Sequence, residues 1–266
     1  MAMRYLSAAG PFLRRRLRPP TIPDPTPRAT VAFADRRSCL ADVYSPAGAK
    51  DAPTAFIVHG GGFVGGSRRM SSVRVVIDEL LRDGFVVASI DYRLVRPWGP
   101  LLEGQAQDVQ DAARWWSEAA PDFGGHPDRT SLIGLSAGGG LALMAAQAAR
   151  FSHFIGIYGA YDLTLLPARL VTATPLARSA KREEQAARSP LLSGLFDQPA
   201  LLVHGDEDPL AVPEHTARLA AARLERSLPT QTHWVGGAVH GFLQDGADHP
   251  HSAQTLGAMR EFLAAV

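Results

Sequence analysis

From residue 54 onward, short apolar runs alternate along the chain with longer segments in which apolar residues recur at helical spacing. The runs with the length of buried strands are 54–59, 85–90, 130–135, 154–158, 200–204 and 230–235. The segments with helical period are 73–82, 103–118, 137–149, 213–226 and 252–265. Such alternation predicts parallel strands joined by crossover helices.

Two further runs, 30–34 and 40–44, predict a strand pair at an antiparallel edge of the same sheet. We therefore expect an α/β fold with a mostly parallel eight-stranded sheet and helices on both faces. The chain has 266 residues, 46% of them hydrophobic, which suits one large core. We expect one α/β domain over 29–266, in which prolines and charged residues at 163–198 break the rhythm and indicate a small lid insertion.

The segment 1–28 is a basic arm that ends in a proline-rich linker, with several arginines and no acidic residue before Asp24. Its arginines follow a short apolar stretch, whereas a secretory signal has its basic residues first. No run reaches the length of a membrane span. We expect no stable membrane insertion, and peripheral contact of the arm with anionic lipid stays open.

The cysteine count and the net charge bear on where the protein is located and on which partners it can bind. The single cysteine, Cys39, can form no internal disulfide, which favours a cytoplasmic location. A formal net charge of +1 provides no general field that would attract nucleic acid. We therefore expect a small molecule bound in a local pocket, and no nucleic-acid partner.

The first chemical motif is Gly134-Leu135-Ser136-Ala137-Gly138, a G-x-S-x-G sequence between an apolar run and an alanine-rich segment. The two glycines leave room for a tight strand-to-helix turn that exposes the serine hydroxyl at the helix N-terminus. We expect Ser136 to be a nucleophile, with the amide of Ala137 facing a developing oxyanion. The alternative is a serine that only caps the helix.

The second motif, His59-Gly60-Gly61-Gly62-Phe63, follows another predicted strand. Glycines let backbone amides approach a substrate oxygen, so Gly61 and Gly62 are the other candidates for an oxyanion hole. The stretch 60–65 also reads G-x-G-x-x-G, which is typical of dinucleotide-binding oxidoreductases. The acidic residue that this reading needs would be Asp91, which lies farther along the chain than that fingerprint places it.

A base and an acid follow the last two predicted strands. His240 lies in a glycine-containing loop after 230–235, and Asp208 lies in a loop after 200–204, with Asp206 as the alternative acid. The order Ser136, Asp208, His240 is that of α/β-hydrolases. Another four residues, Asp245, Asp248, His249 and His251, match no known zinc spacing, and we expect neither a metal nor a cofactor.

These motifs resemble those of the hormone-sensitive-lipase-like and ferulate-esterase-like carboxylesterases of the α/β-hydrolase superfamily. The matching stretches are HGGGF at 59–63, DYRL at 91–94, GLSAGGGLA at 134–142, HGDEDPLAVP at 204–213 and HGF at 240–242. The resemblance covers roughly 30–265 and implies the triad and oxyanion hole named above, no metal, and hydrolysis of short- to medium-chain carboxylic esters through an acyl-enzyme. Leu135 departs from the acidic residue usual before the serine in hormone-sensitive-lipase-like members.

The alternatives are an arylformamidase-type amide hydrolase on the same triad, as some relatives are, and a non-catalytic ligand-binding protein of this fold. For the substrate pocket we expect apolar residues from the loops around the serine. These are Phe63, Val64, Trp98, Tyr161, Leu165, Leu166 and Phe242.

Overall fold

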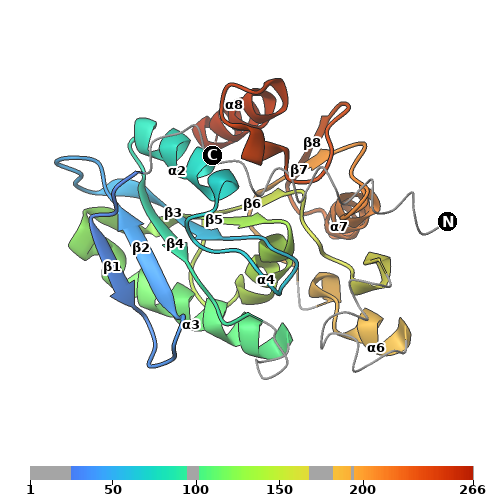
Figure 1. Ribbon diagram of the computed structural model, residues 1–266, viewed down its shortest axis with the longest axis horizontal. Coiled ribbons are helices and arrows are strands. Elements are labelled where there is room, and N and C mark those ends of the chain that lie inside the picture. The colour runs from blue at the N-terminus through green and yellow to red at the C-terminus, as the bar shows by residue number, and fades with distance from the viewer. Residues whose placement is uncertain (1–24, 95–101, 168–181, 193–194, 266) are drawn as a thin grey trace.

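One mixed sheet crosses the centre of the computed structural model, which describes residues 25–94, 102–167, 182–192 and 195–265 (Figure 1). The strands are β1 (Ala29–Ala32), β2 (Leu40–Tyr44), β3 (Ala52–Val58), β4 (Val86–Ile90), β5 (Gly125–Leu135), β6 (His153–Ile157), β7 (Ala200–Gly205) and β8 (Thr230–Val235). Their order is β1-β2-β4-β3-β5-β6-β7-β8. β2 runs antiparallel to β1 and to β4, and the other neighbours are parallel. The predicted eight-stranded sheet with an antiparallel edge is confirmed.

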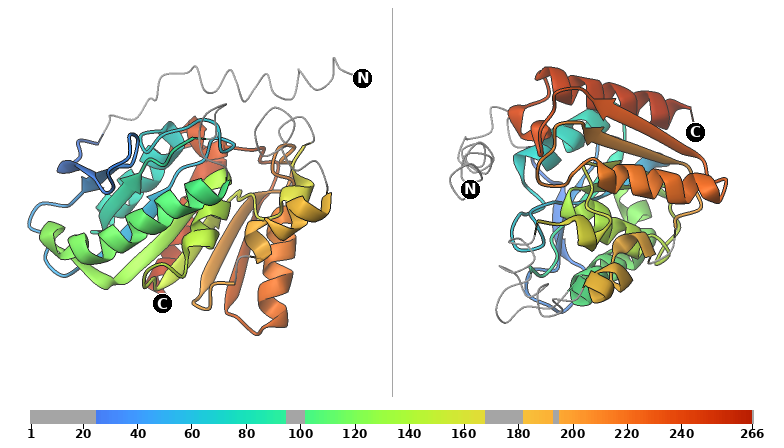
Figure 2. Two further views of the ribbon diagram at one scale, coloured as in Figure 1. Left: turned by 90° about the horizontal axis from the view of Figure 1, so that it is seen from below. Right: turned by 90° about the vertical axis from the view of Figure 1, so that its right-hand side faces the viewer.

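Helices cover both faces of this sheet, as predicted (Figure 2). The α-helices are α2 (Ser71–Arg82), α3 (Leu102–Ala119), α4 (Ala137–Ala145), α6 (Arg182–Ala187), α7 (Glu214–Glu225) and α8 (Pro250–Ala264). The short 3-10 helices are η1 (Ala120–Phe123), η2 (Leu163–Leu165), η4 (Pro190–Leu192) and η5 (Phe242–Asp245). α2 and α8 pack on one face, and α3, α4 and α7 pack on the other.

The strand β3 shows how alternation builds both cores. Ala55 and Ile57 pack toward α2 and α8, whereas Phe56 and Val58 pack toward α3 and α4, and all four side chains are inaccessible to solvent. Successive side chains of a strand point to opposite faces, so a strand covered on both sides is apolar throughout. The central strands are therefore rigid supports for the loops at their carboxyl ends.

Several predicted helices have different ends in the structure, and for two of them the hydrogen bonds at the end show why. The helix expected over 137–149 stops at Ala145, because the amides of Ala146 and Ala148 bond to carbonyls three residues earlier. The last helix begins at Pro250, where the His249 side chain accepts a bond from the amide of His251 and caps it.

Within the described residues, no three His, Cys, Asp or Glu side chains are grouped to hold a metal ion.

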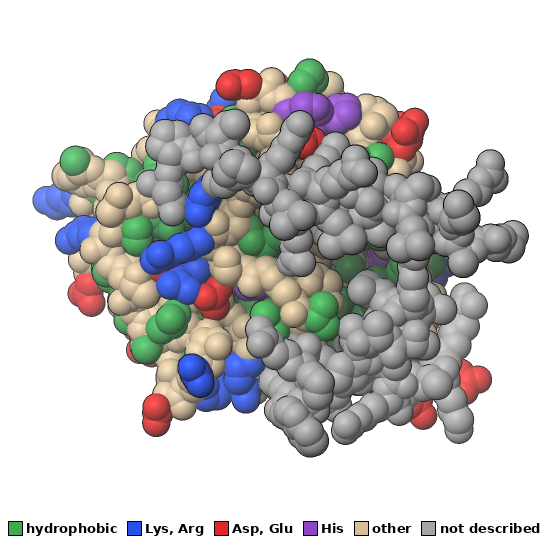
Figure 3. Space-filling view, viewed as in Figure 1, with side chains coloured by type: hydrophobic (Ala, Val, Ile, Leu, Met, Phe, Trp, Pro, Cys, Tyr) green, Lys and Arg blue, Asp and Glu red, His purple; other side chains and the backbone are tan. Residues whose placement is uncertain are grey.

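The predicted insertion 163–198 is described only in part, as η2, α6, η4 and their flanks, and its role as a lid stays a prediction. The predicted arm lies almost wholly outside the described residues, since 1–24 are not among them. No helix in the described part of the chain is both long and apolar enough to cross a membrane. On the face drawn in Figure 3, basic and acidic side chains lie side by side over the left half.

Candidate active site

Ser136 lies at the sharp turn between β5 and α4. Its φ of 55° and ψ of −122° are unusual for a residue with a side chain, and such backbone strain costs on the order of 1–3 kcal/mol. The turn is held because the Ser136 amide donates to the Ile157 carbonyl at 3.0 Å, and the Ser136 carbonyl accepts from Gly139 at 2.9 Å. The strained turn directs the hydroxyl away from the sheet, as the G-x-S-x-G pattern predicts.

Gly138 lets this turn lie directly against the end of β3. A Cβ at position 138 would lie 2.2 Å from the Val58 carbonyl oxygen and 2.4 Å from that of His59. Both contacts are with backbone atoms that cannot move aside without shifting the strand. The last glycine of the motif is therefore required by close packing, and it brings Ser136 beside the glycine-rich loop after β3.

Ser136, His240 and Asp208 form a continuous hydrogen-bonded chain. The Ser136 Oγ lies 2.8 Å from His240 Nε2, and His240 Nδ1 lies 2.6 Å from Asp208 Oδ2. Asp208 follows β7 and His240 follows β8, so three separate strand ends supply the three groups. In this arrangement the carboxylate holds the imidazole with Nε2 directed at the hydroxyl, which is the geometry of a nucleophile and its general base.

The Asp208 carboxyl is buried, with 3% of the residue exposed. Burial alone would raise its pKa, but His240 and His204 on one oxygen outweigh this effect, and the net shift is to a lower pKa. The other oxygen accepts from the amides of Leu210 at 2.9 Å and Ala211 at 3.0 Å. Asp208 is therefore an ionised, fully engaged carboxylate beside the imidazole.

Asp206, the alternative acid, has a different place in the structure. Its Oδ1 accepts from the Gly237 amide at 2.7 Å, and the residue is exposed. This bond links the loop after β7 to the loop after β8. The geometry thus gives Asp206 a bracing contact and leaves Asp208 as the carboxylate on His240.

The glycine-rich loop after β3 faces the serine. Gly61 and Gly62 have φ values of 127° and 62°, and a Cβ on Gly61 would lie 2.0 Å from the Gly65 carbonyl oxygen. The Gly65 amide in turn donates to the Gly61 carbonyl at 3.0 Å, which closes the loop into a tight turn. Gly61, Gly62 and Ala137 line the same cavity as Ser136, which is the placement that an oxyanion hole needs.

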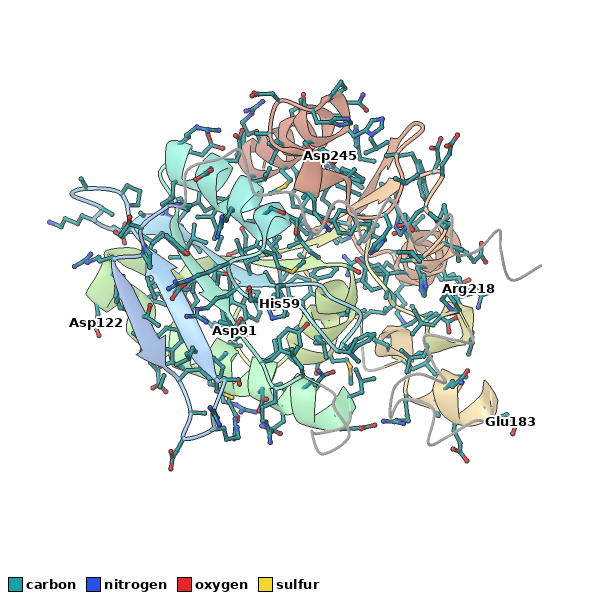
Figure 4. All side chains as sticks on the ribbon, in the orientation of Figure 1. His59, Asp91, Asp122, Glu183, Arg218 and Asp245 are labelled. Carbon is teal, nitrogen blue, oxygen red and sulfur yellow. The ribbon has the colours of Figure 1, made fainter. Side chains whose placement is uncertain are left out.

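Buried polar contacts hold this loop from behind. The His59 ring stacks on Tyr92 at 4.3 Å between centroids, and the Tyr92 hydroxyl donates to the His59 carbonyl at 2.9 Å. His59 Nε2 also lies 3.7 Å from a carboxylate oxygen of Asp91, and the two residues are close together in Figure 4. From α3, the Gln105 amide group donates to the Phe63 carbonyl at 2.8 Å. The loop is thus fixed on both sides before any substrate binds.

A cavity of about 470 Å³ opens beside Ser136. Of the predicted pocket residues, Phe63, Val64 and Leu166 line it. Tyr161 and Phe242 do not, because Tyr161 packs in the core beneath α4 and Phe242 packs against Tyr158. The structure does not place Leu165 in the lining either, and Trp98 lies outside the described residues.

The lining includes several residues that the sequence analysis did not select. They are Gly60, Met70, Ser72, Leu135, Tyr158, Ala160, Pro167, Leu210, Ala211, Gly241 and Gln244. Some had a usable signal, because Tyr158 ends a predicted strand, and Leu210 and Ala211 lie two and three positions after the predicted acid. Met70 and Ser72 had no such signal. They lie at the start of a helix that follows a long loop, and no sequence pattern there indicates that this helix end faces the cavity.

Comparison with known sequences adds to this geometry. The BD-FAE family model matches residues 41–166. Esterase LipC of Mycobacterium tuberculosis is 31% identical over 252 residues, which are 83% of this chain. The chain spans 61% of the length of that esterase. A non-reducing polyketide synthase of Aspergillus novofumigatus is 40% identical over 116 residues, which are 39% of this chain and 5% of the synthase.

Solved structures show the same fold. Esterase Est2 of Thermogutta terrifontis, with butyrate bound, superposes with a TM-score of 0.73 at 21% identity, covering 91% of this chain and 94% of that one. Esterase B of Lactobacillus rhamnosis, inhibited by a tributyrin phosphonate, superposes with a TM-score of 0.74 at 21% identity, covering 99% of this chain and 94% of that one. The sheet order and these likenesses show that the chain has the α/β-hydrolase fold and is similar in sequence to an esterase.

Proposed function

We propose that the protein is a serine carboxylesterase that hydrolyses short- to medium-chain carboxylic esters through an acyl-enzyme intermediate. The observation that carries this proposal is the chain of bonds from Asp208 through His240 to Ser136, at 2.6 and 2.8 Å, ending at a cavity that glycine amides line. A nucleophile, an oriented base and an electrophilic cradle at one point are what acyl transfer requires.

In the acylation half of the reaction, Ser136 Oγ attacks the ester carbonyl carbon while its proton passes to His240 Nε2. The carbonyl oxygen becomes an oxyanion, which the amides of Gly61, Gly62 and Ala137 stabilise. When the tetrahedral intermediate collapses, the bond to the alcohol oxygen breaks and that oxygen takes the proton from His240. The acyl group stays on Ser136, and Asp208 stabilises the imidazolium throughout.

Water completes the cycle. It loses a proton to His240 Nε2 as its oxygen attacks the acyl carbon, and the same amides hold the second oxyanion. Collapse releases the carboxylic acid and returns the proton to Ser136 Oγ. All proton transfers use one nitrogen, which the 2.6 Å contact of Nδ1 with Asp208 keeps in position.

The size and walls of the cavity support short to medium acyl chains. Its volume of about 470 Å³ is bounded by apolar side chains such as Phe63, Val64 and Leu166. Esterase Est2 of Thermogutta terrifontis was solved with butyrate and with propionate bound, which are both short-chain acids. The structural likeness to Est2 therefore supports short-chain esters as the substrate class of this protein.

The test is hydrolysis of para-nitrophenyl butyrate by the native protein and by Ser136→Ala. We expect the substitution to reduce kcat by about 10⁴-fold or more, because the nucleophile is lost. Ser117→Ala, which removes a hydroxyl that donates to the Arg114 carbonyl on the exposed side of α3, is the matched control and should retain activity. A reactive alkyl phosphonate should add one phosphonyl group to the native protein and to the control, but not to Ser136→Ala.

If Ser136→Ala retains full turnover, or if the phosphonate labels it as fast as the native protein, Ser136 is not the nucleophile and the proposal fails. Circular dichroism of both variants checks that the fold is unchanged.

A cytoplasmic setting is the remaining part of the proposal. The one cysteine of the chain, Cys39, is a buried free thiol, and burial raises its pKa. A packed, unreactive thiol suits a reducing compartment.

A further inference from the structure

The cavity beside Ser136 has two chemically different halves. Phe63, Ala160 and Leu166 belong to the core on the α3 and α4 face of the sheet, and they supply only apolar side chains. Leu135 and Tyr158 belong to the core on the α2 and α8 face. With them on this second side lie Met70 and Ser72 from the start of α2, and Gln244 from η5, which packs on α2. We call this second side the polar half.

Tyr158 is the central residue of the polar half. It directly follows β6 with a φ of 40°, and its amide donates to the Val203 carbonyl at 2.7 Å. Its ring lies edge-on to His240 and to Phe242, each at 5.1 Å between centroids. A strained backbone and two aromatic contacts therefore fix the ring beside the catalytic imidazole.

The hydroxyl of Tyr158 is a buried donor whose polar neighbour is the Ser72 hydroxyl, without the geometry of a normal hydrogen bond between them. Only 2% of the residue is exposed, and within the described part of the chain its oxygen makes no hydrogen bond of normal geometry. The Ser72 hydroxyl lies beside it. Burial raises the pKa of Tyr158, so the phenol keeps its proton and stays a donor. A buried donor without a well-aligned acceptor is costly, so a ligand acceptor that reaches the Tyr158 and Ser72 hydroxyls in the cavity would be favoured.

The position of His240 decides which part of an ester meets these hydroxyls. In the proposed reaction the alcohol oxygen takes its proton from His240 Nε2, so the alcohol portion must lie next to that imidazole when the ester bond breaks. Tyr158 touches the same imidazole. The polar half therefore adjoins the alcohol portion, and the apolar half receives the acyl chain.

We infer that Tyr158 and Ser72 form a subsite for a free hydroxyl on the alcohol portion of the substrate, which makes monoesters of diols or polyols the favoured substrate class. The substrate hydroxyl accepts from the Tyr158 phenol and donates to the Ser72 oxygen or the Gln244 side-chain carbonyl. This inference rests on the proposed esterase function and adds selectivity for the alcohol portion.

The test compares two esters of nearly equal size, n-butyl butyrate and 3-hydroxypropyl butyrate, in which a hydroxyl replaces the terminal methyl group of the alcohol. The measured quantity is the ratio of their kcat/KM values, so that intrinsic reactivity cancels between variants. Tyr158→Phe removes one oxygen and keeps the ring contacts with His240 and Phe242. We expect this ratio to fall about three- to tenfold in Tyr158→Phe, which is the worth of one uncharged hydrogen bond.

Two further variants make the result specific. Ser72→Ala should lower the same ratio, and it serves as the second test if Tyr158→Phe does not fold. Leu166→Val alters the apolar half and should leave the ratio within about twofold while changing the rates of both esters alike. A matched pair that differs in the acyl portion, ethyl butyrate and ethyl methoxyacetate, should show a ratio that Tyr158→Phe does not change.

The outcomes separate the inference from the function on which it rests. If Ser136-dependent hydrolysis is present but neither Tyr158→Phe nor Ser72→Ala lowers the alcohol-side ratio, the subsite is wrong and the esterase stands. If Tyr158→Phe changes only the acyl-side ratio, the two halves have been assigned in reverse and the inference fails. If the native protein hydrolyses none of these esters, both proposals fall.

Discussion

The Nε2 atom of His204 lies 3.4 Å from Oδ2 of Asp208, the same carboxylate oxygen that faces His240. His204 is inaccessible to solvent, and its Nε2 donates to the Ala211 carbonyl at 2.7 Å. Its Nδ1 lies 2.7 Å from the Thr216 hydroxyl and accepts from it in the neutral ring. His204 thus links Asp208 to α7 and is a positioning residue for the acid.

Substituting His204 should affect stability and turnover together. His204→Ala leaves the Ala211 carbonyl and the Thr216 hydroxyl without their buried partner, so we expect a loss of about 3 kcal/mol in the free energy of unfolding. We also expect kcat for para-nitrophenyl butyrate to fall about tenfold, because Asp208 is held less firmly. Urea unfolding and steady-state kinetics measure the two effects. Thr216→Val, which removes one hydroxyl, should cost only about 1 kcal/mol. Lower stability with undiminished kcat would show that His204 only packs.

The Tyr92 hydroxyl positions the glycine-rich loop after β3, and a single substitution can test this role. It is buried, and it donates to the carbonyl of His59, the residue that leads into the glycine-rich loop after β3. Tyr92→Phe should cost about 1 kcal/mol of stability and lower kcat several-fold with little change in KM, since the loop amides act mainly in the transition state. Tyr161→Phe is the control for stability, because the Tyr161 hydroxyl has no bonded partner among the described residues. An unchanged kcat in Tyr92→Phe would show that the Tyr92 hydroxyl does not position this loop for catalysis.

Much of the fold and the meeting of the three reactive groups could be predicted from sequence, because both depend on the ends of apolar runs. Ser136 and His240 are 104 positions apart, yet Ser136 directly follows β5 and His240 lies in the loop after β8, so both lie at the same edge of the sheet. Parallel strands present their carboxyl ends at one edge. The carboxyl ends of the buried apolar runs were therefore enough to predict which edge of the sheet carries the reactive groups.

The lining of the cavity could not be predicted in the same way, and two tyrosines show why. Tyr161 was expected in the pocket from the sequence, but Tyr158 lines the cavity and Tyr161 packs in the core. The difference arises from a φ of 40° at Tyr158, which turns the chain as β6 ends. Periodicity indicates where a strand stops, whereas the turn that follows depends on contacts with other elements.

The close approach at Gly138 predicts a severe effect from a single methyl group. In Gly138→Ala the new Cβ would meet the carbonyl oxygens of Val58 and His59 at 2.2 and 2.4 Å, so either β3 or the serine turn must shift. We expect a loss of about 3 kcal/mol or more in stability and of at least about a hundredfold in kcat/KM. Gly257→Ala is the matched control, since nothing lies within 4 Å of its new Cβ in α8, and it should stabilise the protein by about 1 kcal/mol. Near-native activity in Gly138→Ala would contradict this packing.

His215 predicts how stability depends on pH. It is fully buried at the start of α7, and its Nδ1 accepts from the amides of Tyr161 at 3.2 Å and Asp162 at 3.1 Å. Burial, followed by the nearby His204, lowers the pKa of His215 from 6.5 to about 4. The folded protein therefore keeps this ring neutral over a range in which the unfolded chain protonates it.

The direction in which stability changes with pH follows from the number of protons that each state binds. Between pH 6.5 and about 4 the unfolded state binds one more proton at this site than the folded state, so stability falls as pH falls, by about 3 kcal/mol at most from His215. His215→Asn keeps an acceptor for the two amides but cannot titrate. Urea unfolding at several pH values across this window should give a smaller slope of stability against pH for His215→Asn than for the native protein. Equal slopes would mean that His215 titrates alike in both states, and the acid sensitivity would then belong to other groups.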